Sequence, residues 1–239
     1  MFLKMSLVAC AAALALGGCA TMAPSAAMPT TTASGAPVLT IYHLEGRRSE
    51  RLVWLAEELG LPYTLNFKRG DLAGSMAPIR AINPLMPVAP TVTYGDQVIV
   101  ESGAIMEMLL ERHGQGRLKP AVNSADYPYY LQWMHYAEGS FASRVIGDYR
   151  VEMIRPSTNP SPLVDAEDTV RFAEDYLSRH PYFGGAEFSA ADIMMLFPLN
   201  FATSTKVVDI AKFPKLADWR KRMEDETLGV STPPGIVVL

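Results

Sequence analysis

The sequence contains little cysteine: Cys10 and Cys19 are the two cysteines among 239 residues, and from residue 20 onward there is none. The remainder of the chain therefore has no disulfide framework, no cysteine-ligated zinc or iron–sulfur centre and no cysteine nucleophile. The four histidines have neither the HExxH spacing nor neighbouring carboxylate pairs. We therefore expect no metal site.

The sequence also has few charged residues, and it has no long apolar run beyond the N-terminus. Asp, Glu, Lys and Arg make up 19 % of the chain, which carries a net charge of −4. A protein that binds nucleic acid needs clustered Lys and Arg against the phosphates, so we expect no nucleic-acid partner. Beyond the N-terminus no apolar run approaches the ~20 residues of a membrane-spanning helix. The apolar share of 49 % is enough for one or two compact domains.

The N-terminus has the pattern of an export signal. Lys4 precedes an uninterrupted apolar stretch from Leu7 to Leu16, which has signal-peptide length. The stretch runs into a Leu-Gly-Gly-Cys segment that ends at Cys19 and resembles the lipobox of bacterial lipoproteins. The resemblance implies a signal peptide over residues 1–18, a lipid on Cys19 and a membrane-anchored protein on the extracytoplasmic, periplasmic side. The alternatives are an ordinary cleaved signal and a mis-assigned start upstream of a cytoplasmic protein.

A spacer and two structured units follow this signal. Residues 19–37 are uncharged and rich in Thr, Ala, Ser and Pro, which predicts a flexible linker that lifts a domain off the membrane surface. Residues 38–114 and 124–230 have the apolar periodicity of folded sequence. We place the boundary between the two units near residues 114–125.

The first unit reads as an α/β domain. Strands are predicted over residues 38–44 and 63–67, with a helix between them that Gly60 ends. An irregular loop spans residues 83–90. Two short strands then flank Gly95-Asp96 as a hairpin, and Ser102 opens a helix. The predicted order is βαβ, a loop, then ββα.

The second unit reads as all-helical. Its sharpest signal is Ser189 followed by Asp192 at the third helical position, because this pair forms a capping box. Phe188 before the cap and Ile193 after it form a hydrophobic staple. Aromatic residues also follow one helical face, where they form either an apolar pocket or, more often, interface core: Tyr127, Tyr130, Trp133 and Tyr136.

The capping box, inside an all-helical second domain, resembles the folding motif of cytosolic-type glutathione transferases of bacteria. Four further segments resemble the same family in the correct order, and together they span nearly the whole folded chain: Trp54 to Tyr63, Asn83-Pro84 with Val88 to Pro90, Glu101-Ser102 with Ala104-Ile105, and Pro214, Leu216, Trp219 and Arg222. The resemblance implies a thioredoxin-like N-terminal domain followed by an all-α C-terminal domain. It also implies a homodimer, glutathione as co-substrate, and an apolar co-substrate site between the domains.

The implied glutathione site centres on the start of the helix at Ser102. A helix N-terminus favours an anion, so Ser102 suits the γ-glutamyl carboxylate and Glu101 suits the ammonium group. Simple N-capping is the alternative role for Ser102. If Pro90 is cis, the backbone of Ala89 can pair with the tripeptide in the manner of a strand. The loop before Pro90 is one residue longer than the family's, with Met86-Pro87 where Gly-Lys is common.

The family activates the glutathione thiol with a Tyr, Ser or Cys at the end of the first strand. The cysteine class is excluded here, and the Ser-type position, four residues before Arg51, is occupied by Arg47. In the Tyr-type register, Tyr42 becomes the hydroxyl donor and Arg48 a basic neighbour. We favour Tyr42, supported electrostatically by Arg47 or Arg48. A core position for Tyr42 and a hydroxyl role for Ser49 stay open.

Three functions follow. The first is a transferase that conjugates glutathione to apolar electrophiles or reduces peroxides with it. The second is a non-catalytic module that binds glutathione or another ligand, which Arg47 at the Ser-type position favours. The third is an interaction protein that keeps the fold without the tripeptide site.

Overall fold

The computed structural model describes residues 30–31, 35, 37–154 and 166–229. The predicted signal peptide, Cys19 and most of the predicted linker lie outside these described residues. Within the described ranges no helix combines the length and the apolar character needed to cross a membrane.

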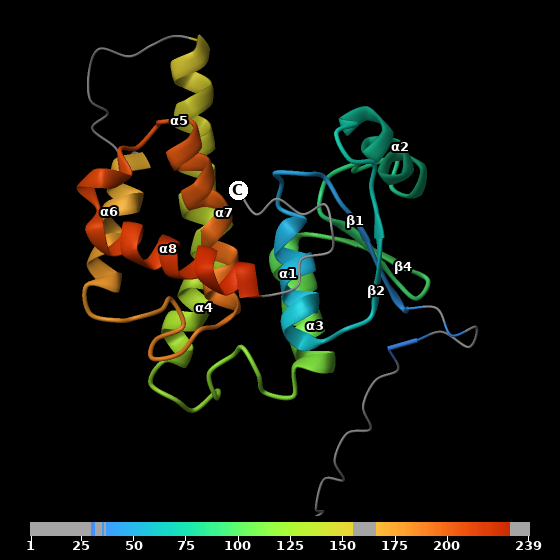
Figure 1. Cartoon of the computed structure of the whole chain (residues 1–239), viewed down its shortest axis with the longest axis horizontal. Helices are drawn as coiled ribbons and strands as arrows, with labels where there is room; N and C mark the ends of the chain where they lie inside the picture. Colours follow the sequence, from blue (N-terminus) through green and yellow to red (C-terminus); the bar gives the residue numbers. More distant parts are fainter. Residues whose placement is uncertain (1–29, 32–34, 36, 155–165, 230–239) are drawn as a thin grey trace, which may run out of the picture.

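The N-terminal domain is a four-stranded sheet with helices on both faces. The strand order is β2-β1-β3-β4, in which β1 runs parallel to β2 and antiparallel to β3, and β4 runs antiparallel to β3. Helices α1 and α3 lie between the sheet and the second domain, whereas α2 lies on the opposite face (Figure 1). The elements are β1 (Leu39–Tyr42), α1 (Glu50–Leu59), β2 (Tyr63–Asn66), α2 (Leu72–Ile82), β3 (Thr91–Tyr94), β4 (Gln97–Val100) and α3 (Ser102–Leu109). This arrangement confirms the thioredoxin-like domain.

Local sequence explains most of these elements. Leu39 and Ile41 alternate into the core below α1, as one face of a half-buried strand requires. Gly60 ends α1 in a left-handed conformation with a φ of 65°, and its backbone N–H donates to carbonyls of the last turn. The hairpin turns at Gly95, whose φ of 57° is also positive.

Helix α2 is missing from the sequence prediction. Asp71 caps it by accepting a hydrogen bond from the backbone N–H of Gly74, and Ser75 and Ile79 are its buried residues. Gly74 and Pro78 both lower helix propensity, so the segment carries no clear helical signal. Contact with the sheet stabilises a helix that local preference does not specify.

Among the described residues of the second domain, the regular elements are helices, with one isolated bridge between Tyr182 and Gly185 in a loop. The helix that carries the aromatic residues begins at Tyr127 and passes through a π-helical segment before it continues as α5. A π-helical segment, η1 (Leu110–Gly114), continues α3 at the end of the first domain. The elements of the second domain are α4 (Tyr127–Tyr136), η2 (Ala137–Ala142), α5 (Ser143–Ile154), α6 (Ala166–Leu177), α7 (Ala190–Ser204), η3 (Ile210–Lys212) and α8 (Pro214–Gly229).

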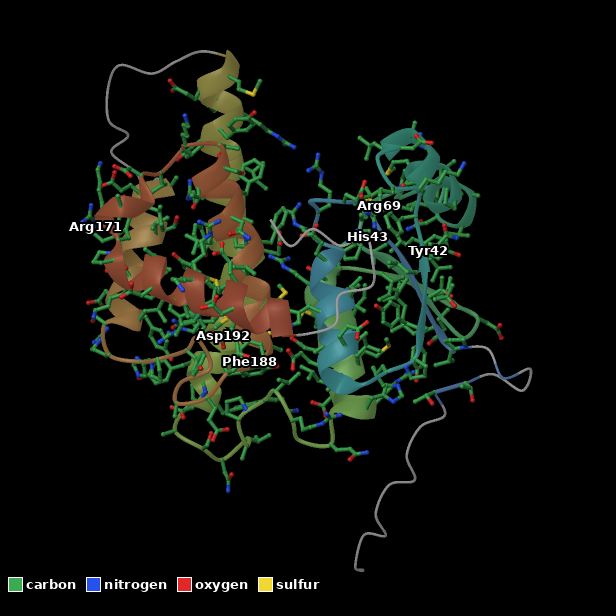
Figure 2. All side chains as sticks on the ribbon, in the orientation of Figure 1. Tyr42, His43, Arg69, Arg171, Phe188 and Asp192 are labelled. Atoms are coloured by element: carbon green, nitrogen blue, oxygen red, sulfur yellow. The ribbon has the colours of Figure 1, made fainter. Side chains whose placement is uncertain are left out.

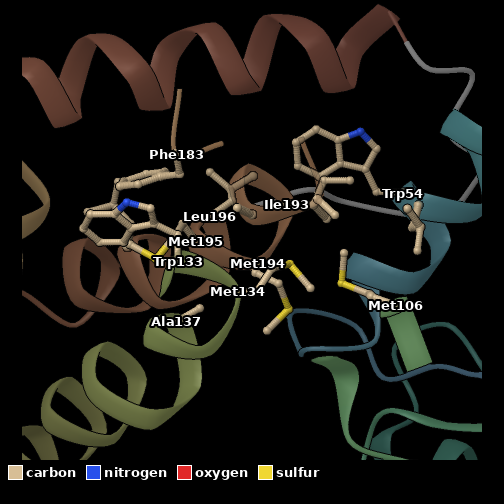
Figure 3. Close-up of a cluster of buried hydrophobic side chains, with 14 of the residues drawn as sticks. Trp54, Met106, Trp133, Met134, Ala137, Phe183, Ile193, Met194, Met195 and Leu196 are labelled. Atoms are coloured by element: carbon tan, nitrogen blue, oxygen red, sulfur yellow. The ribbon is translucent and has the colours of Figure 1, made fainter. Parts of the chain in front are cut away.

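The two domains share one apolar core. Trp54 of α1 and Met106 of α3 face Ile193 and Met194 of α7 (Figure 3). All four side chains are buried, and the cluster continues to Trp133 on α4. Burial of these apolar side chains stabilises the packing of one domain against the other.

The capping box at the start of α7 is present as predicted. Asp192 is fully buried and accepts hydrogen bonds from the backbone N–H groups of Ser189 and Phe183, the hydroxyl of Ser189 and the Nε1–H of Trp219, at 2.9 to 3.1 Å. Burial raises the pKa of Asp192 to about 6, against these donors, which lower it. One carboxyl therefore joins α7 to the preceding loop and to α8.

We expect Asp192→Asn to lower the free energy of unfolding by about 2–4 kcal/mol, because the amide NH₂ would face buried donors that then have no acceptor. Urea denaturation of the variant measures this loss. Asp225→Asn is the matched control, since Asp225 is exposed and forms an ion pair with Lys221 on the same helix. Equal effects of the two substitutions would contradict the structural role of Asp192.

Candidate active site

Sheet register brings most of the predicted site residues to one end of the sheet. Tyr42 pairs with Thr91, and Thr91 pairs with Val100, so the end of β1, the start of β3 and the end of β4 lie side by side. The Ala89–Pro90 peptide bond that precedes β3 is cis. Glu101 and Ser102 follow directly after β4.

Glu101 and Ser102 form the junction between β4 and α3. Glu101 is exposed and has a φ of 74°, a left-handed value that is uncommon for a residue with a side chain. This conformation turns the chain sharply into α3. Ser102, the first residue of α3, is only 3 % exposed. The free N–H groups of the first turn of α3 lie here, at the positive end of the helix dipole.

The side chain of Arg51 reaches the Ser102 hydroxyl from α1. Its Nη1 donates to Ser102 Oγ at 3.0 Å and to Glu138 Oε1 at 2.5 Å, and its Nη2 donates to the carbonyl oxygen of Met194 at 2.7 Å. Arg51 is 3 % exposed, so its charge is almost fully buried. Ser102 Oγ therefore acts as the acceptor in its contact with Arg51.

The carboxylate of Glu138, in η2, forms ion pairs with two guanidinium groups. Arg48 Nε donates to both of its carboxylate oxygens, at 2.8 and 2.9 Å, and Arg51 binds one of the same oxygens. Burial would raise the pKa of Glu138, but the two guanidinium groups outweigh that effect and lower it. The predicted basic residue Arg48 is therefore part of an ion-pair network that spans the two domains.

The loop between β1 and α1 uses several of its polar groups internally. Ser49 is fully buried, accepts from the backbone N–H of Leu44 at 3.0 Å and lies 3.0 Å from Nδ1 of His43. Burial lowers the pKa of His43 to about 4, so the imidazole is neutral at pH 7. Glu50 accepts from the backbone N–H of Gly46 at 2.7 Å, and burial raises the pKa of Glu50 to about 7. Ser49 thus sits inside the loop, away from solvent.

Arg47 and Tyr42 occupy different surroundings. Arg47 is exposed at the turn before α1, where Nη1 donates to the carbonyl oxygen of Gly46. Tyr42 alternates with the buried Ile41, so its side chain lies on the face of the sheet opposite α1. In Figure 2, Tyr42 lies farther from the helical domain than His43.

A cavity of about 720 Å³ lies between α1 and α7, beside this loop. Its apolar wall consists of Trp54, Ile193, Leu196, Phe197 and Phe201. None of the residues of the α4 aromatic stripe lines it; Tyr130 and Trp133 are buried in the domain core instead. Of the two roles considered for the aromatic residues of α4, the core role is therefore the one that Tyr130 and Trp133 have.

Comparison with known protein families identifies both domains of the chain. Residues 37–111 match the glutathione S-transferase N-terminal domain, and residues 163–226 match the C-terminal domain of the same family. The chain belongs to the glutathione S-transferase family. This family uses glutathione as its co-substrate. Among the described residues no group of three or more His, Cys, Asp or Glu side chains is placed to hold a metal ion.

Relatives of this glutathione S-transferase family member are distant. Glutathione S-transferase 3 of Schizosaccharomyces pombe is 29 % identical over 207 residues, which cover 79 % of this chain and 84 % of the relative. A glutathione S-transferase from Actinobacillus pleuropneumoniae superposes with a TM-score of 0.65 at 26 % identity, over 82 % of this chain and 88 % of its own. A glutathione transferase from Phanerochaete chrysosporium, solved with oxidized glutathione, shows the same fold with a TM-score of 0.62 at 22 % identity, over 78 % of this chain and 90 % of its own.

Sequence reasoning missed two members of the site. The sequence pattern uses Arg51 only to align the loop with the family, and it gives no role to Glu138. The signal for Arg51 was its helical position beside Leu52 and Leu55, because a charged residue beside the apolar face of a buried helix needs a partner. Nothing local to Glu138 identifies it as that partner.

Proposed function

We propose that this protein is a glutathione transferase that conjugates glutathione to apolar electrophiles. The observation that carries the proposal is the arrangement at the sheet end, where Ser102 opens α3 beside Glu101 and the cis Ala89–Pro90 bond. The helix N-terminus and the Ser102 hydroxyl suit the γ-glutamyl carboxylate, and Glu101 suits the ammonium group. The backbone of Ala89 offers strand-like pairing to the tripeptide.

The reaction requires the thiolate of glutathione. The thiol gives its proton to solvent, a lone pair of the resulting thiolate sulfur forms a bond to the electrophilic carbon, and the leaving group departs with the electron pair of the bond that breaks. A free thiol titrates near pH ~8.5, so a nearby cation or hydroxyl donor must stabilise the thiolate at neutral pH. Tyr42 is the hydroxyl donor we propose, and Arg47 and the N-terminus of α1 supply positive potential.

The non-catalytic alternative rests on the loop before α1. Arg47 stands where a Ser-type enzyme carries its hydroxyl, Ser49 is buried, and Tyr42 lies on the α2 face of the sheet. Under this alternative the protein binds glutathione or a related ligand without turnover. Both functions are compatible with the homodimer that is typical of the family.

We further propose that Cys19 carries a lipid that anchors the protein on the periplasmic side of the membrane. The support is the Leu-Gly-Gly-Cys segment after an apolar stretch, with an uncharged spacer behind it. The proposal places conjugation at the membrane surface, where apolar electrophiles concentrate.

Ser102→Ala is expected to weaken glutathione binding about tenfold, because one hydrogen bond to a carboxylate is lost. Calorimetry on the full chain measures the dissociation constant. Ser178→Ala is the matched control, since Ser178 is an exposed serine of the second domain. If both variants bind glutathione as the wild type does, Ser102 is only a structural residue of α3.

Tyr42→Phe is expected to lower kcat about a hundredfold near pH 6.5, where the thiol most needs help to ionise, with KM for glutathione unchanged. Turnover is followed with a panel of electrophiles, and Tyr127→Phe serves as the control. Unchanged kcat in Tyr42→Phe, together with loss of turnover in Arg47→Gln, would move thiol activation from the strand to the loop. A wild type that binds glutathione but turns over none of the panel would favour the non-catalytic alternative.

Cys19→Ala is expected to abolish incorporation of labelled palmitate and to release the protein from the membrane fraction. Cys10→Ala is the internal control, because it removes the other cysteine and leaves the lipobox intact. A Cys19→Ala protein that stays membrane-bound would show that the anchor assignment is wrong.

A further inference from the structure

Glu50 is a carboxyl group that lines the cavity between α1 and α7 and forms no salt bridge among the described residues. It is the first residue of α1, and its backbone N–H donates to the carbonyl oxygen of Arg47 at 3.1 Å. Its side chain folds back, so that Oε1 accepts from the backbone N–H of Gly46 at 2.7 Å. The carboxyl therefore lies over the loop that carries Arg47.

The second oxygen of this carboxyl is accessible from the cavity. Oε2 accepts no hydrogen bond from the described residues, yet it is not among the buried polar atoms left without a partner, so it has exposed area. Glu50 as a whole is half-buried and forms part of the cavity wall. A molecule in the cavity can therefore contact Oε2.

The surroundings of Glu50 retain a proton on the carboxyl near neutral pH. Burial is the largest effect, and it raises the pKa of Glu50 to about 7. The hydrogen bond from Gly46 and the charge of Arg47 lower this pKa, whereas the charge of Glu45 raises it. At pH 7 roughly half of the Glu50 side chains are therefore protonated.

Other elements around the cavity bring no further unpaired charge to Glu50. Arg51, the next residue of α1, forms an ion pair with Glu138. Arg220 of α8 forms an ion pair within its own helix. The residues of α7 that line the cavity are uncharged. Besides Glu45 and Arg47, the charged side chains that line the cavity therefore have partners of their own.

The proposed position of the glutathione sulfur is close to this carboxyl. In the proposed function Arg47 and the N-terminus of α1 stabilise the thiolate, and Glu50 opens that helix. The apolar wall of α7, which includes Leu196 and Phe197, faces α1 across the same cavity (Figure 1). An electrophile that packs against this wall lies in a cavity that Arg47 and Glu50 both border.

We propose that Glu50 is a catalytic residue that donates its proton to the oxygen of an apolar epoxide as the ring opens. The thiolate sulfur forms a bond to one ring carbon, the bond from that carbon to oxygen breaks, and its electron pair goes to the oxygen. The oxygen takes the proton of Glu50, and the carboxylate that remains regains a proton from solvent. The inference rests on the proposed transferase function, and it adds a proton donor and the class of electrophile that needs one.

Two benzylic electrophiles of similar size test this role. Opening of styrene oxide produces an alkoxide that must be protonated, whereas benzyl chloride releases chloride, which needs no proton. At saturating glutathione, Glu50→Gln is expected to lower kcat for styrene oxide about a hundredfold and to leave kcat for benzyl chloride unchanged. Gln keeps an acceptor for the N–H of Gly46, so the loop retains its hydrogen bond. Glu111→Gln is the control, because Glu111 is exposed and lies outside the cavity, and it is expected to change neither rate.

The pH dependence of the wild type is a second test that needs no variant. Glu50 loses its proton as the pH rises through its pKa of about 7, so kcat for styrene oxide is expected to fall above that pH. Over the same range kcat for benzyl chloride is expected not to fall, because that reaction needs the thiolate alone. Identical pH profiles for the two electrophiles overturn the proposal, even where Glu50→Gln does not fold.

The two electrophiles also separate this inference from the function beneath it. An equal loss of both rates in Glu50→Gln, or no loss with styrene oxide, overturns the role of proton donor. A wild type that turns over benzyl chloride but not styrene oxide overturns the proposal and leaves the transferase function intact. A wild type that binds glutathione and turns over neither electrophile contradicts the transferase function, and the proposal fails with it.

Discussion

The buried guanidinium of Arg51 connects the parts of this protein that must act together. A charge removed from water is strongly destabilising unless partners surround it, and here those partners come from three segments. Ser102 lies at the start of α3, Glu138 in η2, and the carbonyl of Met194 in α7. The contact is complete only when the helical domain packs on the sheet domain, so the Ser102 hydroxyl and the docking of the domains depend on each other.

The proposed chemistry divides between the two domains in the same way. The sheet domain collects backbone groups and a helix N-terminus at one end, which suits a polar, charged tripeptide. The helical domain contributes a wall of aromatic and aliphatic side chains from α7, which suits an apolar molecule. Arg51 belongs to both sites, because it touches Ser102 on one side and lies close to Phe197 on the other.

Patterns of short range were predictable from the sequence. The hairpin at Gly95, the end of α1 at Gly60 and the capping box at Ser189 each depend on residues within a few positions of one another. Helix α2 was not predictable in this way, because Gly74 and Pro78 oppose the helix locally and contact with β1 supplies its stability. The site residues Glu101 and Ser102 followed from family resemblance, and Tyr42 followed from one of two possible registers.

The sequence by itself determined the order of the four strands, the absence of cysteine from residue 20 onward and the resemblance to the family. The tertiary structure decided which side chains meet. Arg51 and Glu138 are 87 positions apart, and their contact depends on how two helices pack rather than on any local pattern. The same is true of the face on which Tyr42 lies and of the cavity between α1 and α7. These contacts form only when the packing of the two domains sets the distances between side-chain atoms to within about an ångström. The types of residue along the chain do not by themselves specify those distances.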